Sequence, residues 1–167
     1  MLHPKILMTI KIENNFLRNS SFWKICKTVS SENFPWYIDG KYNDLIHTLI
    51  DTSNKKPVSS FYANEILSPL VSQLNCKQIN YAKLILNFCS SKIIEQAAPK
   101  HEIDINDKNY KGLLCINTNN SEIQIIGTNK VSSVENRFMS FPKNTPYFAT
   151  THTDKRCRIL LEIIYNA

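Results

Sequence analysis

The stretch from Lys100 to the C-terminus constrains the fold most, because it is divided into short apolar runs. Clusters of Asn, Gly, Ser, Thr, Asp and Pro separate these runs at short, regular spacing. This pattern predicts several short strands that fold into a β-sandwich or a barrel. It is clearest in Gly112–Asn120, Val134–Pro142 and Pro146–Tyr165.

The residues before Lys100 predict two helices. The first follows the candidate capping residues Asn19 and Ser20, and its apolar face includes Trp23 as an expected core residue. The second covers Tyr62–Leu74, and we expect Pro69 to interrupt it because proline cannot donate a helical hydrogen bond.

Two further segments of this region predict strands, Leu45–Ile50 and Ile79–Phe88. His47 lies in the first, where a lone histidine is typical of a hydrogen-bonded core or edge residue. Helices early and strands late predict an α+β chain, mostly β. In this arrangement, N-terminal helices support one face of a jelly roll.

The length of 167 residues suits one domain, spanning 1–167, with a substantial core. Hydrophobic residues make up 43% and aromatic residues 10%, as in globular proteins. The formal net charge of +6 is spread along the chain without a run of five or six like charges. A basic solvated surface therefore explains the charge better than nucleic-acid binding does, and we do not expect a nucleic-acid partner.

The cysteine pattern argues against a disulfide framework and a structural zinc site. Five cysteines are present, and no two are spaced as C-x-x-C. No apolar stretch approaches the roughly 20 residues of a membrane-spanning helix, and the N-terminus does not read as a signal peptide. We therefore expect a chain without a membrane partner, in the cytoplasm or, if viral, in the host cytoplasm.

The last predicted strand has one charged and one apolar face. Side chains two residues apart on a strand point the same way, so Arg158, Leu160 and Glu162 share a face. Ile159 and Leu161 share the opposite face with further apolar residues. The charged face is expected to line a wet cavity or to meet solvent.

Several motifs along the chain resemble those of the 2-oxoglutarate/Fe(II)-dependent oxygenases. N-F-P-W-Y (33–37) is similar to an early segment of the short phage and marine-microbial members, which are prolyl-hydroxylase-like. P-Y-F-A-T-T (146–151) resembles their P-H-x-G-T-x pattern, and T-D-K-R-C-R (153–158) their T-D-x-x-x-R step. The resemblance covers nearly the whole chain and implies a double-stranded β-helix, which is a jelly roll.

The resemblance also implies where a metal ion would bind. Family members hold Fe(II) with His-x-Asp/Glu and a distant His. The aligned residues here are Glu102, Asp104 and Tyr147, with His101 and His152 as alternative ligands. An aligned set of three oxygen donors lacks the imidazole that suits Fe(II) and leans toward harder ions such as Mg²⁺, Ca²⁺, Mn²⁺ or ferric iron.

For the cosubstrate, the resemblance implies that Arg158 pairs with the distal carboxylate of 2-oxoglutarate, a task suited to a planar guanidinium. Lys83 is a candidate cofactor-binding residue in the same pocket. The alternative for Lys83 is a side chain that lies along the sheet with its ammonium in water. Glu162 places a negative charge in this pocket and counts against tight binding of an anion.

Two functions follow from the resemblance. The first is a 2-oxoglutarate-dependent dioxygenase, which would use Fe(II) and 2-oxoglutarate to hydroxylate an unknown substrate, here with altered metal ligands and reduced or no activity. The second is a catalytically inactive pseudo-oxygenase that serves as a binding or structural module, since the jelly roll is stabilised by its apolar sheet faces rather than by the metal. A sugar- or nucleic-acid-binding jelly roll rests only on net charge.

Overall fold

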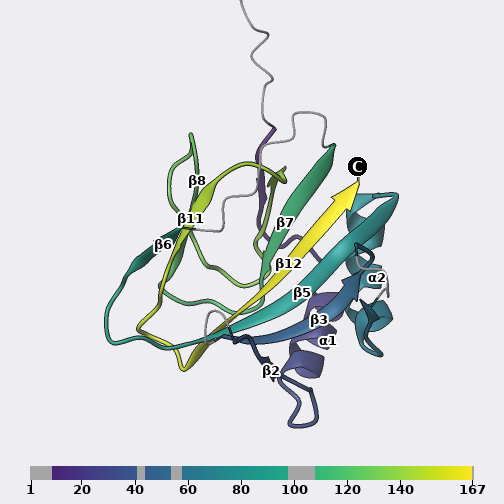
Figure 1. Ribbon diagram of the computed structural model, residues 1–167, viewed down its shortest axis with the longest axis horizontal. Coiled ribbons are helices and arrows are strands. Elements are labelled where there is room, and N and C mark those ends of the chain that lie inside the picture. Colours follow the sequence, from purple (N-terminus) through teal and green to yellow (C-terminus); the bar gives the residue numbers. More distant parts are fainter. Residues whose placement is uncertain (1–8, 41–43, 54–57, 98–107, 167) are drawn as a thin grey trace, which may run out of the picture.

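The computed structural model describes residues 9–40, 44–53, 58–97 and 108–166. These residues form two antiparallel sheets and two helices, with the strands running in jelly-roll fashion (Figure 1). The larger sheet has the order β1-β10-β7-β12-β5-β3-β2, and β4 also pairs with β3. Its strands are β1 (Lys11–Glu13), β10 (Phe138–Pro142), β7 (Asn109–Cys115), β12 (Cys157–Asn166), β5 (Gln78–Phe88), β3 (Leu45–Asp51), β2 (Tyr37–Ile38) and β4 (Val58–Ser59).

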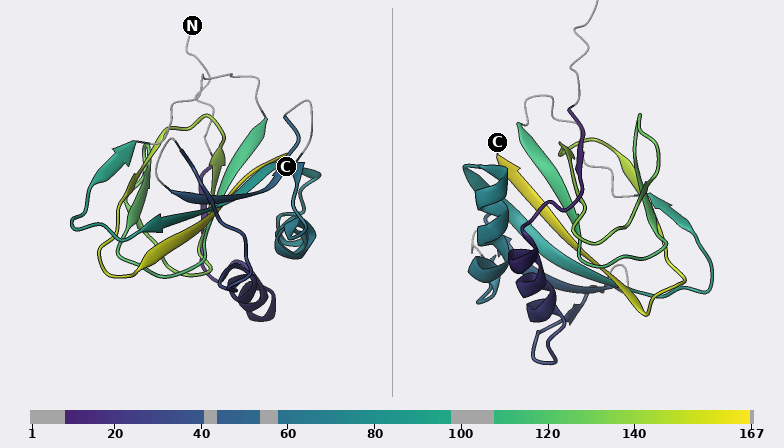
Figure 2. Two further views of the ribbon diagram at one scale, coloured as in Figure 1. Left: turned by 60° about the horizontal axis from the view of Figure 1, so that its bottom comes forward. Right: turned by 180° about the vertical axis from the view of Figure 1, so that it is seen from behind.

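The smaller sheet has the order β6-β11-β8-β9. Its strands are β6 (Glu95–Ala97), β11 (Tyr147–Thr150), β8 (Glu122–Ile125) and β9 (Val131–Ser132). The helices α1 (Asn19–Val29) and α2 (Ala63–Leu74) lie on one side of the larger sheet, and the smaller sheet lies on the other (Figure 2). The predicted jelly roll with supporting helices is therefore confirmed.

The larger sheet separates two apolar cores. On the helix side, Ile25 and Ile66 of the helices pack with Leu161 and Ile163 of β12. On the other side, Leu160 of β12 packs with residues of the smaller sheet. The alternation expected on the last strand is thus confirmed. Burial of each such aliphatic side chain contributes roughly 1.5–3 kcal/mol, so the two cores hold the three layers together.

Gly112 permits the close packing of β7 on the helix-side core. A Cβ atom at this position would lie 2.5 Å from the ring of Phe138 and 2.8 Å from a side-chain carbon of Ile163. Neither neighbour is free to move far, because Phe138 and Ile163 are themselves buried. Only glycine fits this point of β7 without a shift of the strand.

The helices differ from the sequence-based prediction in three details. Trp23 is 58% exposed, so its assignment to the core is wrong: the buried stripe of α1 passes through Phe22, Ile25 and Val29 instead. Arg18 occupies the N-cap position of α1 without a side-chain hydrogen bond, so neither Asn19 nor Ser20 caps it.

Pro69 lies inside α2 and does not interrupt it. The prediction that Pro69 interrupts the helix was wrong because it considered only the hydrogen bond lost through the missing N–H group of proline. Leu67 and Leu70 on either side of the proline are buried against the sheet, and this packing holds the helix together across the defect.

The aromatic segment before β2 is tied to the sheet by His47 of β3. Its Nδ1 lies 2.7 Å from the carbonyl oxygen of Pro35, and its Nε2 lies 2.6 Å from Oγ of Ser60. Phe34 and Tyr62 pack against the imidazole ring. The interpretation of His47 as a hydrogen-bonded core histidine is confirmed.

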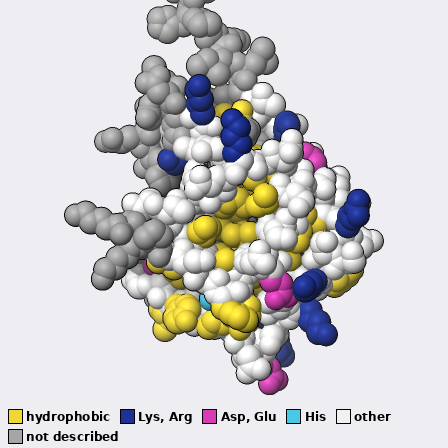
Figure 3. All heavy atoms as spheres, turned by 90° about the vertical axis from the view of Figure 1, so that its right-hand side faces the viewer, with side chains coloured by type: hydrophobic (Ala, Val, Ile, Leu, Met, Phe, Trp, Pro, Cys, Tyr) yellow, Lys and Arg dark blue, Asp and Glu magenta, His cyan; other side chains and the backbone are white. Residues whose placement is uncertain are grey.

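The side of the molecule on which α2 lies carries hydrophobic side chains near its centre and along its lower edge, with Lys and Arg side chains around them (Figure 3). Within the part of the chain that the structure describes, neither helix is long and apolar enough to cross a lipid bilayer.

Candidate functional site

A cavity of about 800 Å³ lies between the two sheets. This volume is typical of pockets that bind small molecules. Strands β5 and β12 supply much of its floor, and the smaller sheet supplies Ile123, Tyr147 and Ala149 from the opposite side. The charged face predicted for the last strand lines this cavity, with Arg158, Leu160 and Glu162 among the lining residues.

Arg158 is buried at one end of the cavity, with 8% of its surface exposed. Its Nε and Nη2 donate to Oδ1 of Asn87 at 3.0 and 2.6 Å, and its Nη1 donates to the carbonyl oxygen of Thr150 at 3.0 Å. Both partners are neutral. No carboxylate of the described residues lies within ion-pair distance of this guanidinium.

Burial lowers the pKa of Arg158, whereas Cys115 and Asp44 act in the opposite direction. A guanidinium has five N–H donors, and three are used here, so two remain for a ligand. We refer to Arg158, Asn87 and Thr150 as the arginine end of the cavity. This end is suited to a carboxylate or a similar planar anion.

Asn87 is a site residue that sequence reasoning missed. It stands directly opposite Arg158 in the β5–β12 ladder. The available signal was a polar residue close to the end of the predicted strand, but only the register of the two strands shows that it lies opposite the arginine.

The other end of the cavity contains three side chains from three strands. Nζ of Lys111 lies 3.6 Å from Oε2 of Glu162, and these side chains are only 5% and 12% exposed. The hydroxyl of Tyr147 donates to the same Oε2 at 3.4 Å. The ammonium of Lys111 lies 5.2 Å from the centre of the Tyr147 ring, which is a cation–π contact. We refer to these three residues as the lysine end.

Tyr147 aligns with the family's distal metal ligand, and its role as a ligand stays a prediction. Burial raises the pKa of its phenol, and the carboxylate of Glu162 raises it further. The phenol therefore stays protonated and donates its hydrogen bond. Lys111 places a positive charge beside the ring, where it repels a second cation.

Lys83 lines the cavity close to the lysine end. It stands opposite Glu162 in the β5–β12 ladder, and its ammonium lies 5.9 Å from the centre of the Tyr81 ring. Burial raises the pKa of Tyr81, and the nearby Lys83 partly offsets this. The side chain is thus placed where sequence reasoning expected it, while its role in binding a cosubstrate stays a prediction.

His152 is fully buried but does not line the cavity. Neither ring nitrogen has a hydrogen-bond partner within the described part of the chain. Burial lowers its pKa, and the positive charge of Arg158 acts in the same direction. Its role as an alternative metal ligand stays a prediction.

The other predicted ligands, His101, Glu102 and Asp104, lie outside the described residues. Across the ranges that are described, no three His, Cys, Asp or Glu side chains are grouped so that they could hold a metal ion. The roles of His101, Glu102 and Asp104 as metal ligands stay predictions.

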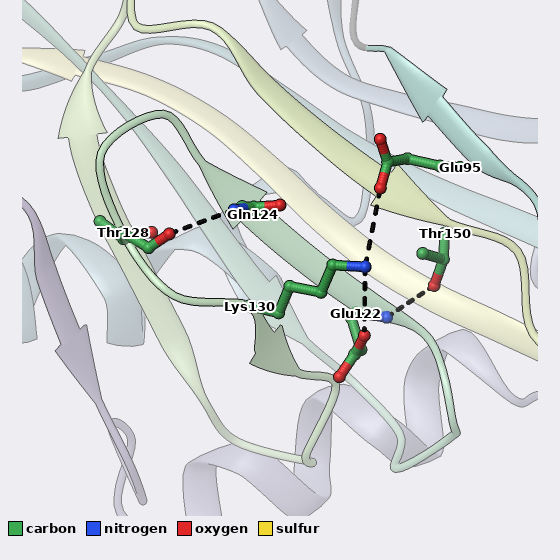
Figure 4. A network of polar contacts seen from close by, with 6 residues as sticks. All are labelled: Glu95, Glu122, Gln124, Thr128, Lys130 and Thr150. Carbon is green, nitrogen blue, oxygen red and sulfur yellow. Dashed lines mark hydrogen bonds and ion pairs between the residues drawn. The ribbon is translucent and has the colours of Figure 1, made fainter.

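Thr150 connects the arginine end to the outer surface of the smaller sheet. Its carbonyl accepts from Arg158, and its Oγ1 accepts from the backbone N–H of Glu122 at 2.8 Å. Lys130 bridges Glu122 and Glu95 at 3.9 and 3.7 Å on this surface (Figure 4). These contacts join β6, β8 and β11 and hold the strand from which the Thr150 carbonyl projects.

Comparison with known proteins identifies the fold. No family model matches the sequence, and no curated protein matches it. Among solved structures, a prolyl-4-hydroxylase from Pseudomonas putida is similar, with a TM-score of 0.66, 11% identity, and coverage of 96% of this chain and 93% of that chain.

Two further structures agree. A prolyl hydroxylase from Trichoplax adhaerens, in complex with a fragment of the hypoxia-inducible-factor oxygen degradation domain, gives a TM-score of 0.63 and 11% identity, covering 94% of this chain and 83% of that chain. HygX from Streptomyces hygroscopicus, with nickel and 2-oxoglutarate bound, gives 0.62 and 8%, covering 99% and 87%. Together with the two facing sheets and the cavity between them, these similarities show that the chain has the double-stranded β-helix fold of the 2-oxoglutarate/Fe(II)-dependent oxygenases.

Proposed function

We propose that this chain is a 2-oxoglutarate/Fe(II)-oxygenase-like protein of the hydroxylase type in which altered metal ligands leave Fe(II)-dependent activity reduced or absent. In this proposal, the cavity still binds a small carboxylate at Arg158. The observation that carries it is the hydrogen bond from Tyr147 to Glu162 beside the ammonium of Lys111. A protonated phenol next to a fixed positive charge is a poor ligand for a divalent metal ion.

The arginine end supports the retained part of the function. A buried guanidinium with only neutral partners is costly, and a ligand carboxylate relieves this cost by charge-assisted hydrogen bonds. HygX was solved with 2-oxoglutarate bound, which supports the same class of ligand for this cavity.

A second candidate is a catalytically inactive binding module with no metal chemistry. Lys111 favours it specifically, because its ammonium lies against the residue that aligns with the family's distal ligand. Both candidate functions include binding of a ligand carboxylate in the cavity. They differ in whether residual Fe(II) binding supports turnover.

Anaerobic titration with Fe(II) and then 2-oxoglutarate tests the proposal, with the weak visible charge-transfer band of the ternary complex as the readout. The wild-type protein is expected to bind Fe(II) weakly and to show at most a faint band. Tyr147→His restores an imidazole and should bind Fe(II) more tightly than wild type, whereas the matched control Tyr147→Phe should not. A wild-type band that saturates at the same Fe(II) concentration as the band of Tyr147→His contradicts the proposal.

A turnover assay separates the two candidates. Release of succinate above the metal-free background in the wild-type protein supports an oxygenase with reduced activity. Background release over a range of Fe(II) concentrations, from protein whose folding is verified by circular dichroism, supports the inactive binding module.

A further inference from the structure

The cavity has a positive charge at each end and an apolar floor between them. Arg158 provides the charge at one end and Lys111 the charge at the other. Leu160 of β12 lies between Arg158 and Glu162 in the sequence and pairs with Ile85 of β5, and both line the cavity. A ligand that matches this pattern carries two anionic groups joined by a short apolar chain.

The two ends are held apart by a single strand. Arg158 and Glu162 are four residues apart on β12, in a stretch of the β5–β12 ladder without a register shift. At about 3.4 Å per residue their Cα atoms are separated by about 14 Å. Lys111 lies opposite Ile164 in the β7–β12 ladder, and its ammonium reaches to within 3.6 Å of Oε2 of Glu162. The guanidinium of Arg158 and this ammonium therefore lie toward opposite ends of the same cavity.

Charge counting favours an anionic ligand. The described cavity lining contains four cationic residues, Lys83, Lys111, Lys143 and Arg158, against three carboxylates, Asp39, Asp44 and Glu162. Glu162 forms an ion pair with Lys111, and at 3.6 Å this pair is long. An ammonium has three N–H donors, so Lys111 can contact Glu162 and a ligand anion together.

We infer that Lys111 serves as a built-in cation where the related oxygenases use a metal ion, so that the cavity binds a linear dicarboxylate without metal. One carboxylate pairs with Arg158 and the other with Lys111, and the chain between them lies over Leu160 and Ile85. This inference rests on the proposed function, because an intact Fe(II) centre at Tyr147 is incompatible with an ammonium at this place. It adds the ligand class and the residue that replaces the metal.

Isothermal titration calorimetry on protein freed of metal by a chelating resin tests the inference. The probes are succinate, glutarate, 2-oxoglutarate and adipate, with butyrate as the monocarboxylate, in a chloride buffer without competing polyvalent anions. The best dicarboxylate is expected to bind at least about tenfold more tightly than butyrate, the usual effect of one additional charge-assisted contact.

Variants then assign the second charge. Lys111→Met is expected to reduce dicarboxylate affinity by about tenfold to a hundredfold and to leave butyrate unchanged. Glu162→Gln removes the competing carboxylate and should tighten dicarboxylate binding severalfold. Lys27→Met, which removes an exposed lysine from α1 on the helix side of the larger sheet, is the matched control and should change neither.

The double variant Lys111→Met/Glu162→Gln keeps the test valid if Lys111→Met alone folds poorly, because it removes both charges of the pair. This double variant should fold, and its affinities for the best dicarboxylate and for butyrate should differ less than they do in the wild-type protein. Dicarboxylate binding that is absent, or that Lys111→Met leaves intact, overturns the inference while the proposed function stands. Binding that requires added Mn(II) overturns both, since it shows a working metal site.

Discussion

The two ends of the cavity differ in the partners of their buried cations. At the arginine end, Arg158 is held by an amide and a carbonyl, and its charge is left without a described carboxylate partner. At the lysine end, Lys111 is paired with Glu162, and Tyr147 donates to the same carboxylate. The first end is ready to accept an anion, whereas the second already contains one.

This difference separates binding from metal chemistry. In an Fe(II) oxygenase, the end of the cavity opposite the cosubstrate arginine must hold a divalent cation. Here the ammonium of Lys111 lies at that end, 3.6 Å from the carboxylate of Glu162. The proposed function therefore allows carboxylate binding and metal binding to change separately, because the two ends of the cavity rest on different residues.

Breaking the pair at the lysine end is expected to have the largest effect on stability. Lys111→Met leaves the carboxylate of Glu162 buried without its cation and should lower the free energy of unfolding by about 3 kcal/mol. Urea unfolding followed by circular dichroism measures this.

The double variant Lys111→Met/Glu162→Leu is the control, since it replaces the pair by apolar groups and should recover most of the loss. Equal destabilisation in the single and double variants would show that the pair contributes through packing rather than through charge.

At the arginine end, Asn87→Leu removes the acceptor of two guanidinium N–H groups. We expect a loss of about 2 kcal/mol in unfolding free energy, because Arg158 keeps its charge and loses part of its hydrogen bonding.

Asn87→Asp makes the arginine end resemble the lysine end. The new carboxylate should pair with Arg158, restore stability relative to Asn87→Leu and weaken butyrate binding measured by calorimetry. Unchanged butyrate affinity in Asn87→Asp would mean that Arg158 is not the carboxylate site.

His152 should make stability fall in mild acid. Burial and Arg158 lower its pKa, so the folded protein keeps this imidazole neutral while the unfolded chain protonates it near pH 6.5. Stability from this group is complete above about pH 6.5 and falls as pH drops toward the lowered pKa, by at most about 1.4 kcal/mol per pH unit.

His152→Leu removes this titration without adding a charge. The difference in unfolding free energy between pH 7 and pH 5 should be smaller in the variant than in wild type. Identical pH slopes in the two proteins would exclude His152 as the titrating group.

Tyr147→Phe is expected to have the smallest effect. It removes one hydrogen bond of 3.4 Å and keeps the ring that packs against Phe141, so the loss should stay below about 1 kcal/mol. Thermal unfolding measures this. A larger loss, or a change in metal content on purification, would indicate that the phenol oxygen does more than donate to Glu162.

Periodicity in the sequence predicted the elements and one face of the cavity well. Leu45–Ile50 and Ile79–Phe88 were predicted as strands and belong to β3 and β5. The alternation at Arg158, Leu160 and Glu162 depends only on strand geometry, so it could be predicted without knowing the partners.

Contacts across strands and between sheets could not be predicted in this way. Asn87 faces Arg158 through the register of β5 and β12, and Lys111 reaches Tyr147 through the packing of one sheet on the other. A single lysine inside an apolar strand looks the same in the sequence whether its ammonium lies in water or over a buried ring. The prediction that Trp23 is a core residue was wrong for a similar reason. One step around a helix separates the buried stripe from solvent.

Gly112 has a consequence for the lysine end, although it lies on the far side of the sheet. A side chain there would press against Phe138 and Ile163, and the strand could yield only by moving away from the helices. We expect such a movement to carry Lys111, the adjacent residue, toward Tyr147 and to reduce the space between the sheets. Gly112 thus bears on the size of the cavity although an added side chain there would lie on the opposite face of the sheet.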